Sequence, residues 1–417
     1  MSTMTPLPEG YRPVDLPADR RDELLLADGW AFPDAATPEQ AKDWPLPLTW
    51  ERTRGIEAPD GELVATHSSY PFADFPVPGA RTAVSGLTWV GVHPGHRRRG
   101  LLRHVIDEHL ARSLARGEAV SALFAAEPAI YGRFGYGLAA MDMRLTIPRG
   151  AALREVAGSA ELRVRIEHLD IERHGSLVAA LHGAVDRPGW ATRQSPELHA
   201  ASFNDPESYR EGAESARIAV AERDGMPVGY ARFRRKGDWA PAGPQGVVKV
   251  RDVVAADPAV AHRLWSLLLD LDLMASVEVG MLPVDDSILR LLVDPRAALP
   301  RLGDNVWVRL LDVPVALAAR RYAAPVDVVL EVTDALLPAN AGRWRLVGGP
   351  DGATVTATQD AADLALDVRE LGAAYLGGVP LAGLATAGQV AELTSGTLAR
   401  ATTAFGWHQA PVCGWVF

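Results

Sequence analysis

Hydrophobic and polar positions in the first third of the chain change from the period of a strand to the period of a helix. Residues 87–92 form an apolar, β-rich run that ends at Pro94. From Leu101 to Leu114 apolar positions recur every three or four residues, as on one face of a helix. This pattern predicts a strand, a short loop and an amphipathic helix in that order.

The same reasoning predicts further elements on both sides of this unit. A helix is expected over residues 19–27, and strands over 49–57 and 63–70. Residues 80–92 are expected to supply strands interrupted at Ser85 and Gly86, and residues 119–125 a buried strand. Antiparallel strands followed by strand, loop, helix and strand indicate a mixed α/β domain.

Later in the chain the strand–turn–helix pattern returns. Residues 217–222 and 227–233 predict a hairpin, and residues 247–254 predict a strand that leads through Pro258 into a helix over 261–271. We interpret this unit as a degenerate copy of the first, which lacks the basic loop and is expected to bind no cofactor. An independent α/β domain is the alternative. Beyond Pro300 the pattern predicts a third unit, with strands at 306–311, 326–333, 342–346, 353–357 and 364–368 and helices at 369–376 and across 388–399.

Composition limits the class of protein. A chain of 417 residues is too long for one ordinary core, so two or three domains are expected. A net charge of −10 argues against general nucleic-acid binding. The single cysteine, Cys413, excludes an internal disulfide framework, and no apolar run is long enough to span a membrane. We therefore expect a cytoplasmic enzyme that has no membrane or nucleic-acid partner.

The loop between the strand and the helix carries Arg97, Arg98 and Arg99 beside Gly100. Backbone N–H groups in the first turn of a helix lack intrahelical partners, and the helix dipole favours negative charge there. The loop is therefore a candidate anion site, although it could also be a basic surface turn. Its spacing is neither that of a Walker loop nor that of a dinucleotide-binding turn.

The pattern Val-x-Val-x-Pro-x-x-Arg-Arg-Arg-Gly-Leu-Leu resembles the acyl-CoA loop of the GNAT N-acetyltransferases, except that Leu102 stands where a small residue is usual. The run Ile-Tyr-Gly-Arg-Phe-Gly-Tyr-Gly at residues 130–137 resembles the enhanced intracellular survival (Eis) branch of that superfamily. Residues 367–378 resemble its sterol-carrier-like terminal domain. The resemblance implies an α/β fold with a catalytic GNAT domain at 1–159, a degenerate GNAT domain at 160–302 and a sterol-carrier-like domain at 303–417.

The resemblance also implies which residues form the site. Acetyl-CoA would lie against the strand end, the loop, the helix start and the segment that precedes the tyrosine: Val90, Gly91, Val92, Arg98, Arg99, Gly100, Leu101, Leu102, Arg103, Ala126 and Glu127. Tyr131 would be the general acid for the departing thiolate, and the terminal carboxylate of Phe417 the base. The alternatives are that Tyr131 only packs, and that the aromatic tail only covers the third domain.

The implied reaction is acetyl-CoA-dependent N-acetylation of primary amines of the aminoglycoside, polyamine or lysine type by a homohexamer. A substrate pocket is expected near Phe32 and Trp44, where Asp28 and Asp34 could attract cations. No metal is expected, because the histidines around the loop lie beside arginines that repel a cation. The alternative function is a lipid or small-molecule carrier that uses the terminal domain and has an idle GNAT domain.

Overall fold

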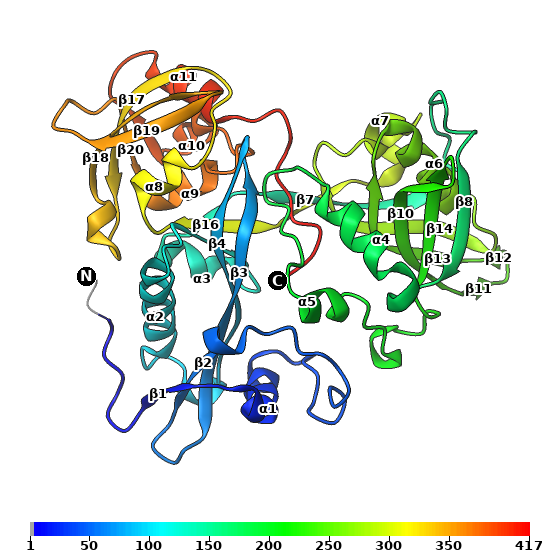
Figure 1. Ribbon diagram of the computed structural model, residues 1–417, viewed down its shortest axis with the longest axis horizontal. Coiled ribbons are helices and arrows are strands. Elements are labelled where there is room, and N and C mark those ends of the chain that lie inside the picture. The colour runs from blue at the N-terminus through cyan, green and yellow to red at the C-terminus, as the bar shows by residue number, and fades with distance from the viewer. Residues whose placement is uncertain (1–3) are drawn as a thin grey trace.

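Strands assemble into three large β-sheets in the computed structural model, which describes residues 4–417 (Figure 1). The first sheet has seven strands in the order β1-β2-β3-β4-β5-β16-β6. Their bounds are β1 Arg12–Asp15, β2 Arg54–Glu57, β3 Leu63–Val77, β4 Ala80–Val92, β5 Val120–Phe124, β6 Gly137–Leu138 and β16 Val306–Leu310. Helices α1 (Arg21–Ala31) and α2 (Leu101–Ala115) both pack on β3 and β4.

The second sheet also has seven strands, in the order β15-β7-β14-β13-β10-β9-β8. Their bounds are β7 Met141–Pro148, β8 Arg163–His168, β9 Arg217–Arg223, β10 Met226–Lys236, β13 Gly246–Ala255, β14 Met274–Pro283 and β15 Arg301–Asp304. Helices α4 (Ile171–Gly183) and α6 (Pro258–Leu269) pack on it, and α5 (Pro196–Ala201) packs on α4. A two-stranded sheet of β11 (Trp239–Ala240) and β12 (Gly243–Pro244) and the one-turn helix α7 (Ile288–Leu291) complete this unit.

The third sheet has five strands in the order β19-β18-β17-β20-β21. Their bounds are β17 Val326–Thr333, β18 Gly342–Gly349, β19 Gly352–Ala357, β20 Leu364–Asp367 and β21 Val390–Glu392. The accompanying helices are α8 Val313–Ala318, α9 Val368–Ala374, α10 Leu381–Thr386 and α11 Thr397–Phe405. The expectation of a mixed α/β fold with three units in tandem is confirmed. None of the helices in residues 4–417 is long and apolar enough to cross a membrane.

The first two sheets exchange strands. The chain leaves β6 in the first sheet and enters the second sheet as β7, and it returns from β15 in the second sheet to the first as β16. Sheet membership therefore crosses the divisions at residues 159 and 302 that the sequence suggests. The crossing strands tie the two units together through backbone hydrogen bonds.

Three details of the sequence interpretation are wrong. The strand expected over residues 49–57 begins only at Arg54, because residues 50–52 form a turn of 3-10 helix. Residues 80–92 form one strand, because Ser85 and Gly86 pair with both neighbours, β3 and β5. Residues 388–399 are not helical throughout: β21 lies between α10 and α11, and Gly388 and Gly396 adopt left-handed backbone angles that break a helix.

A buried ion pair joins β16 to the third unit. Arg309 Nη2 donates to both carboxylate oxygens of Asp334 at 2.7 Å, and both side chains are almost fully inaccessible to solvent. The Asp334 carboxylate also accepts from the backbone N–H groups of Leu336 and Leu337. Such a pair contributes little net stability, but the loss of one partner leaves an uncompensated buried charge.

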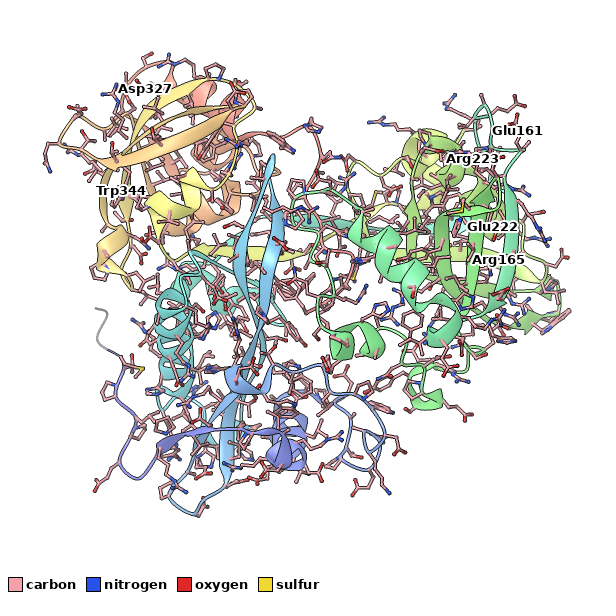
Figure 2. The ribbon with its side chains drawn as sticks, in the orientation of Figure 1. Glu161, Arg165, Glu222, Arg223, Asp327 and Trp344 are labelled. Carbon is pink, nitrogen blue, oxygen red and sulfur yellow. The ribbon has the colours of Figure 1, made fainter. Side chains whose placement is uncertain are left out.

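We therefore expect Asp334→Ala to lower the free energy of unfolding by about 3–5 kcal/mol, measured by calorimetry or urea denaturation. The matched control is Asp327→Ala at the outer edge of the same unit (Figure 2). This substitution breaks the exposed ion pair between Asp327 and Arg345. Little change is expected there, because solvent screens exposed pairs. Equal effects of the two substitutions would contradict the importance of the buried pair.

Candidate functional site

The site begins where β4 separates from β5. Their parallel pairing starts at Val84 and Val120 and ends at Gly86 and Ala122, while β4 continues to Val92. On its other edge β4 stays paired with β3, as far as Ala65 and Val92. The last residues of β4 therefore have unpaired backbone groups along one open edge. An extended ligand that contains amide groups can form hydrogen bonds with them.

A β-bulge accompanies this separation. Thr66 pairs with Gly91 and Ser68 pairs with Thr88, so two steps along β3 correspond to three steps along β4. Within the bulge Trp89 has φ +54°, a left-handed value that is unusual for a residue other than glycine. Thr66 Oγ1 donates to the Trp89 carbonyl at 3.1 Å and holds the bulge in place. Bulges bend a strand and are frequent beside active sites.

The basic loop delivers the chain from β4 to the start of α2. Arg98 (φ +62°) and Gly100 (φ +84°) both adopt left-handed angles, and α2 begins at Leu101 without a side-chain cap. Its first intrahelical bond runs from His104 N–H to the Gly100 carbonyl. The N–H groups of Leu101, Leu102 and Arg103 thus have no intrahelical partner and are available to an anion.

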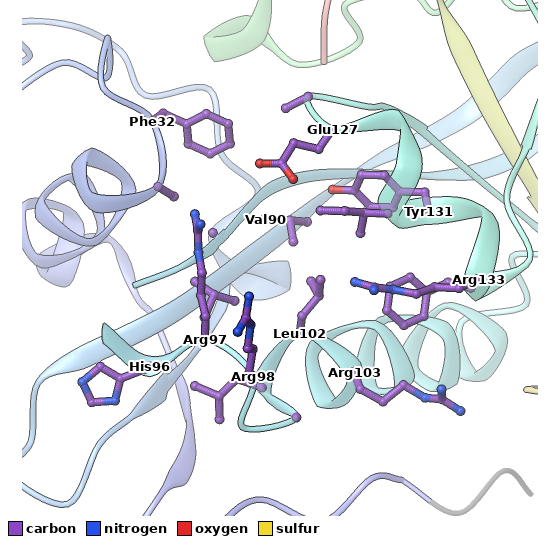
Figure 3. Close-up of a pocket in the computed structure, with 18 residues that line it drawn as sticks. Phe32, Val90, His96, Arg97, Arg98, Leu102, Arg103, Glu127, Tyr131 and Arg133 are labelled. Carbon is purple, nitrogen blue, oxygen red and sulfur yellow. The ribbon is translucent and has the colours of Figure 1, made fainter. Parts of the chain in front are cut away.

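The open edge, the loop and the helix start surround one cavity of about 460 Å³ (Figure 3). Most of the cofactor positions expected from the sequence line this cavity: Val90, Gly91, Val92, Arg98, Gly100, Leu101, Leu102, Arg103, Ala126 and Glu127. Tyr131 lines it as well. Other lining residues were not assigned to the cofactor from the sequence: Ala31, Phe32, His96, Arg97, Ile130, Arg133 and Phe134.

Arg99 lies outside the lining, and Arg97 lies inside it. Arg99 Nη1 donates to the Tyr11 hydroxyl at 3.0 Å, and that hydroxyl lies 2.8 Å from Nδ1 of His96. Arg97 and Arg98 point into the cavity (Figure 3). Sequence spacing alone could not tell these three consecutive arginines apart, because the left-handed turn at Arg98 decides which of them face inward.

Tyr131 enters the cavity from the opposite side. It belongs to the short helix α3 (Pro128–Tyr131) and is 8% exposed. Its hydroxyl points toward the carboxylate of Glu127 (Figure 3). Burial, and to a lesser degree the negative charge of Glu127, raises the pKa of Tyr131 to about 12. The phenol is therefore neutral at physiological pH and can donate a proton.

Phe417 does not line the cavity but docks beside it. Its ring meets Phe72 of β3 edge-to-face at 4.9 Å and Phe124 of β5 at 5.1 Å, measured between ring centroids. The residue is 6% exposed. Phe124 is the last residue of β5, and the cavity residues Ala126 and Glu127 follow two and three positions later. The end of the chain is thus packed on the first sheet, near the end of β5.

The expected substrate region is only partly assembled as predicted. Phe32 lines the cavity, whereas Trp44 packs edge-to-face on Tyr209 of the second unit at 5.1 Å. Asp28 is buried, and burial together with the charge of Asp34 raises its pKa to about 6. Both carboxyl groups also raise the pKa of Tyr209, after the larger effect of its burial. Two acids, one on α1 and one three residues after its end, therefore lie near Tyr209 of the second unit.

The second sheet repeats the strand–turn–helix arrangement with a different helix start. Asp257 caps α6 by accepting from the Val260 N–H at 3.0 Å, and it pairs with Arg223 at 2.7 Å. The Asp257 carboxylate therefore caps the start of α6, whereas the start of α2 has no side-chain cap. In residues 4–417 no group of three or more His, Cys, Asp or Glu side chains is arranged to hold a metal ion.

Family models match three parts of the chain. Two of them, each described as an acetyltransferase (GNAT) domain, match residues 16–139 and 183–310, and a sterol carrier protein domain matches residues 313–414. The first match ends just before β7 crosses to the second sheet, and the second includes β16.

Relatives match this chain over nearly its whole length. The chain is 42% identical to an uncharacterized N-acetyltransferase of Streptomyces avermitilis over 94% of both proteins. It is 32% identical to the N-acetyltransferase Eis of Mycobacterium tuberculosis, over 92% of this chain and 93% of that one. The crystal structure of Eis1 from Mycobacterium abscessus superposes with a TM-score of 0.82 at 30% identity, covering 97% of this chain and all of that one. The chain belongs to the Eis family of GNAT N-acetyltransferases, and it is an acetyltransferase with two GNAT domains followed by a sterol-carrier-like domain.

Proposed function

We propose that the protein transfers the acetyl group of acetyl-CoA directly to a primary amine, with Tyr131 as general acid and the terminal carboxylate of Phe417 as base. The observation that carries this proposal is the single cavity that joins the bare start of α2 to the phenol of Tyr131. The cofactor's diphosphate would bind at Arg97, Arg98 and the first turn of α2. Its pantetheine arm would pair with the open edge of β4 at residues 90–92.

The reaction requires one bond to form and one to break. The amine nitrogen attacks the thioester carbonyl carbon, and the Val92 N–H would stabilise the oxyanion that develops. Collapse of this intermediate breaks the carbon–sulfur bond, and the thiolate takes the proton of Tyr131. The raised pKa of the phenol means that its proton is still present when the thiolate forms.

The base must accept the proton that the amine loses. An α-carboxylate has a reference pKa of about 3.5 and is a weak base in water. The Phe417 ring contacts the rings of Phe72, Phe124 and Trp415, and these contacts would hold the terminal carboxylate near the end of β5. The carboxylate would take the proton directly or through a water, and it would also orient the ammonium group.

The amine would approach along α1 and the facing segment of the second unit. Asp28 and Asp34 supply negative charge there, and Phe32 supplies an apolar wall. This environment suits polycationic amines such as aminoglycosides and polyamines, or the side chain of lysine. A homohexamer, as the family resemblance implies, is the assembly we propose.

Tyr131→Phe should lower kcat by about 10²–10⁴-fold, because it removes the proton donor. The KM for acetyl-CoA should change little, since the ring and its packing remain. Thiol release with a panel of amines measures both constants, and wild-type kcat in the variant would exclude the acid role. Tyr230→Phe is the matched control, because that hydroxyl is buried in the second sheet and, within residues 4–417, has no hydrogen-bond partner.

The arginines give a second comparison. Arg97→Ala combined with Arg98→Ala should raise the KM for acetyl-CoA about tenfold or more, because two contacts to phosphate are lost. Arg99→Ala should change it little, because that guanidinium bonds to Tyr11 outside the cavity. A larger effect at Arg99 than at the pair would contradict the proposed placement of the diphosphate.

Adding a few residues after Phe417 should abolish turnover without unfolding the protein, because the terminal carboxylate then becomes an internal amide. Titration calorimetry should still detect acetyl-CoA binding, since the residues proposed for the diphosphate are untouched. Full activity of the extended protein would remove the carboxylate from the mechanism.

A further inference from the structure

The last twelve residues cross from the third unit to the first by passing along the second. In Figure 1 this red segment leaves α11 and runs down between the first two units to the C-terminus beside α5. The segment at 187–191 holds it at three points. Arg187 Nη1 donates to the Ala410 carbonyl at 2.6 Å, the Val412 N–H donates to the Pro188 carbonyl at 3.0 Å, and Trp415 Nε1 donates to the Ala191 carbonyl at 2.7 Å.

Asn305 clamps the middle of this tail. Its side-chain Oδ1 accepts from the Cys413 N–H at 2.8 Å, and its Nδ2 donates to the Cys413 carbonyl at 3.1 Å. The same Nδ2 lies 3.3 Å from an oxygen of Asp142. Asn305 is fully buried and stands between β15 and β16, where the chain returns to the first sheet. One amide therefore fixes the tail to the crossing that joins both GNAT units.

The tail also fits closely against the second unit. A Cβ added at Gly414 would lie 2.7 Å from the ring of Trp190, so the ring occupies the space of a side chain. Gly189 adopts a left-handed angle and lies close to the backbone of Val412. This packing leaves the tail little freedom along residues 410–415.

Arg193 completes the contact next to the chain end. Its guanidinium carbon lies 4.9 Å from the ring centroid of Trp415, in a cation–π arrangement. Burial lowers the pKa of Arg193 to about 10, and no carboxylate in residues 4–417 lies within ion-pair distance of it. The Trp415 ring in turn contacts the Phe417 ring at 5.7 Å. Arg193 therefore acts on the last residue through one aromatic side chain.

We infer that Asn305 and Arg193 are positioning residues for the terminal carboxylate, and that the second GNAT unit serves acetyl transfer as a socket for the end of the chain. Terminal residues usually fray, whereas a base must be held to within a fraction of an ångström. The role of the second unit would thus be mechanical, with no cofactor of its own. This inference rests on the proposed function, in which the terminal carboxylate is the base.

The test compares Arg193→Ala and Arg193→Lys with Arg223→Ala, a control on the far side of the second unit (Figure 2). The first readout is the rate at which a carboxypeptidase releases Phe417 and Val416 from the folded protein. The second is kcat and the KM for acetyl-CoA. Arg193→Ala should speed release about tenfold and lower kcat by a similar factor, with KM unchanged. Arg193→Lys should partly restore the wild-type release rate and kcat. Arg223→Ala should match the wild type in both.

Asn305→Asp tests the clamp more severely, because it removes the donor to the Cys413 carbonyl and places a second carboxylate beside Asp142. Release should be faster than in Arg193→Ala. If this variant fails to fold, the Arg193 variants decide.

Wild-type release together with wild-type kcat in Arg193→Ala would overturn the inference. So would faster release with unchanged kcat, because the tail would then be held for stability alone. The extended protein separates this failure from a failure of the proposed function. If extension abolishes turnover while the Arg193 variants are normal, the terminal base stands and the socket does not.

Discussion

The parting of β4 from β5 is the constraint on which the site depends. A parallel pair that stays together satisfies its own backbone groups and leaves nothing for a ligand. Here the pairing ends at Gly86, and the bulge at Trp89 turns the rest of β4 aside. The opening runs from the bare start of α2 to Tyr131, so one structural feature forms both the region proposed for the diphosphate and the region proposed for acetyl transfer.

Two strands that cross between the first two sheets connect the unit that contains this opening to the second unit. β7 and β16 each cross between the first two sheets, and the buried pair of Arg309 and Asp334 attaches the crossing strand to the third unit. The C-terminal tail uses the same junction, since Asn305 lies within it. All three units therefore meet around one short stretch of chain. The end of the polypeptide contacts the first sheet through the Phe417 ring, and residues 410–415 contact the second unit.

Local patterns predicted the elements well. The change from strand to helix period at residues 87–114 located β4, the loop and α2, and the family resemblance of residues 130–137 pointed to Tyr131. Those patterns could not show the bulge, because Trp89 is an ordinary strand residue whose positive φ is imposed by its surroundings. Nor could they show that β7 and β16 change sheets, since this depends on pairing between residues 128 or more positions apart. They also could not show that Arg97 lines the cavity and Arg99 does not. That difference depends on the backbone angles of the loop, such as the positive φ of Arg98, which a run of three arginines does not reveal.

The most direct test of this account is a crystal structure of the protein with CoA and an amine bound. We predict that the diphosphate lies on Arg97, Arg98 and the first turn of α2, and that the cofactor's sulfur lies within hydrogen-bonding distance of the Tyr131 hydroxyl. The amine nitrogen should lie between that sulfur and the carboxylate of Phe417, directly or through one water. CoA bound elsewhere, or a terminal carboxylate pointing away from the amine, would contradict it.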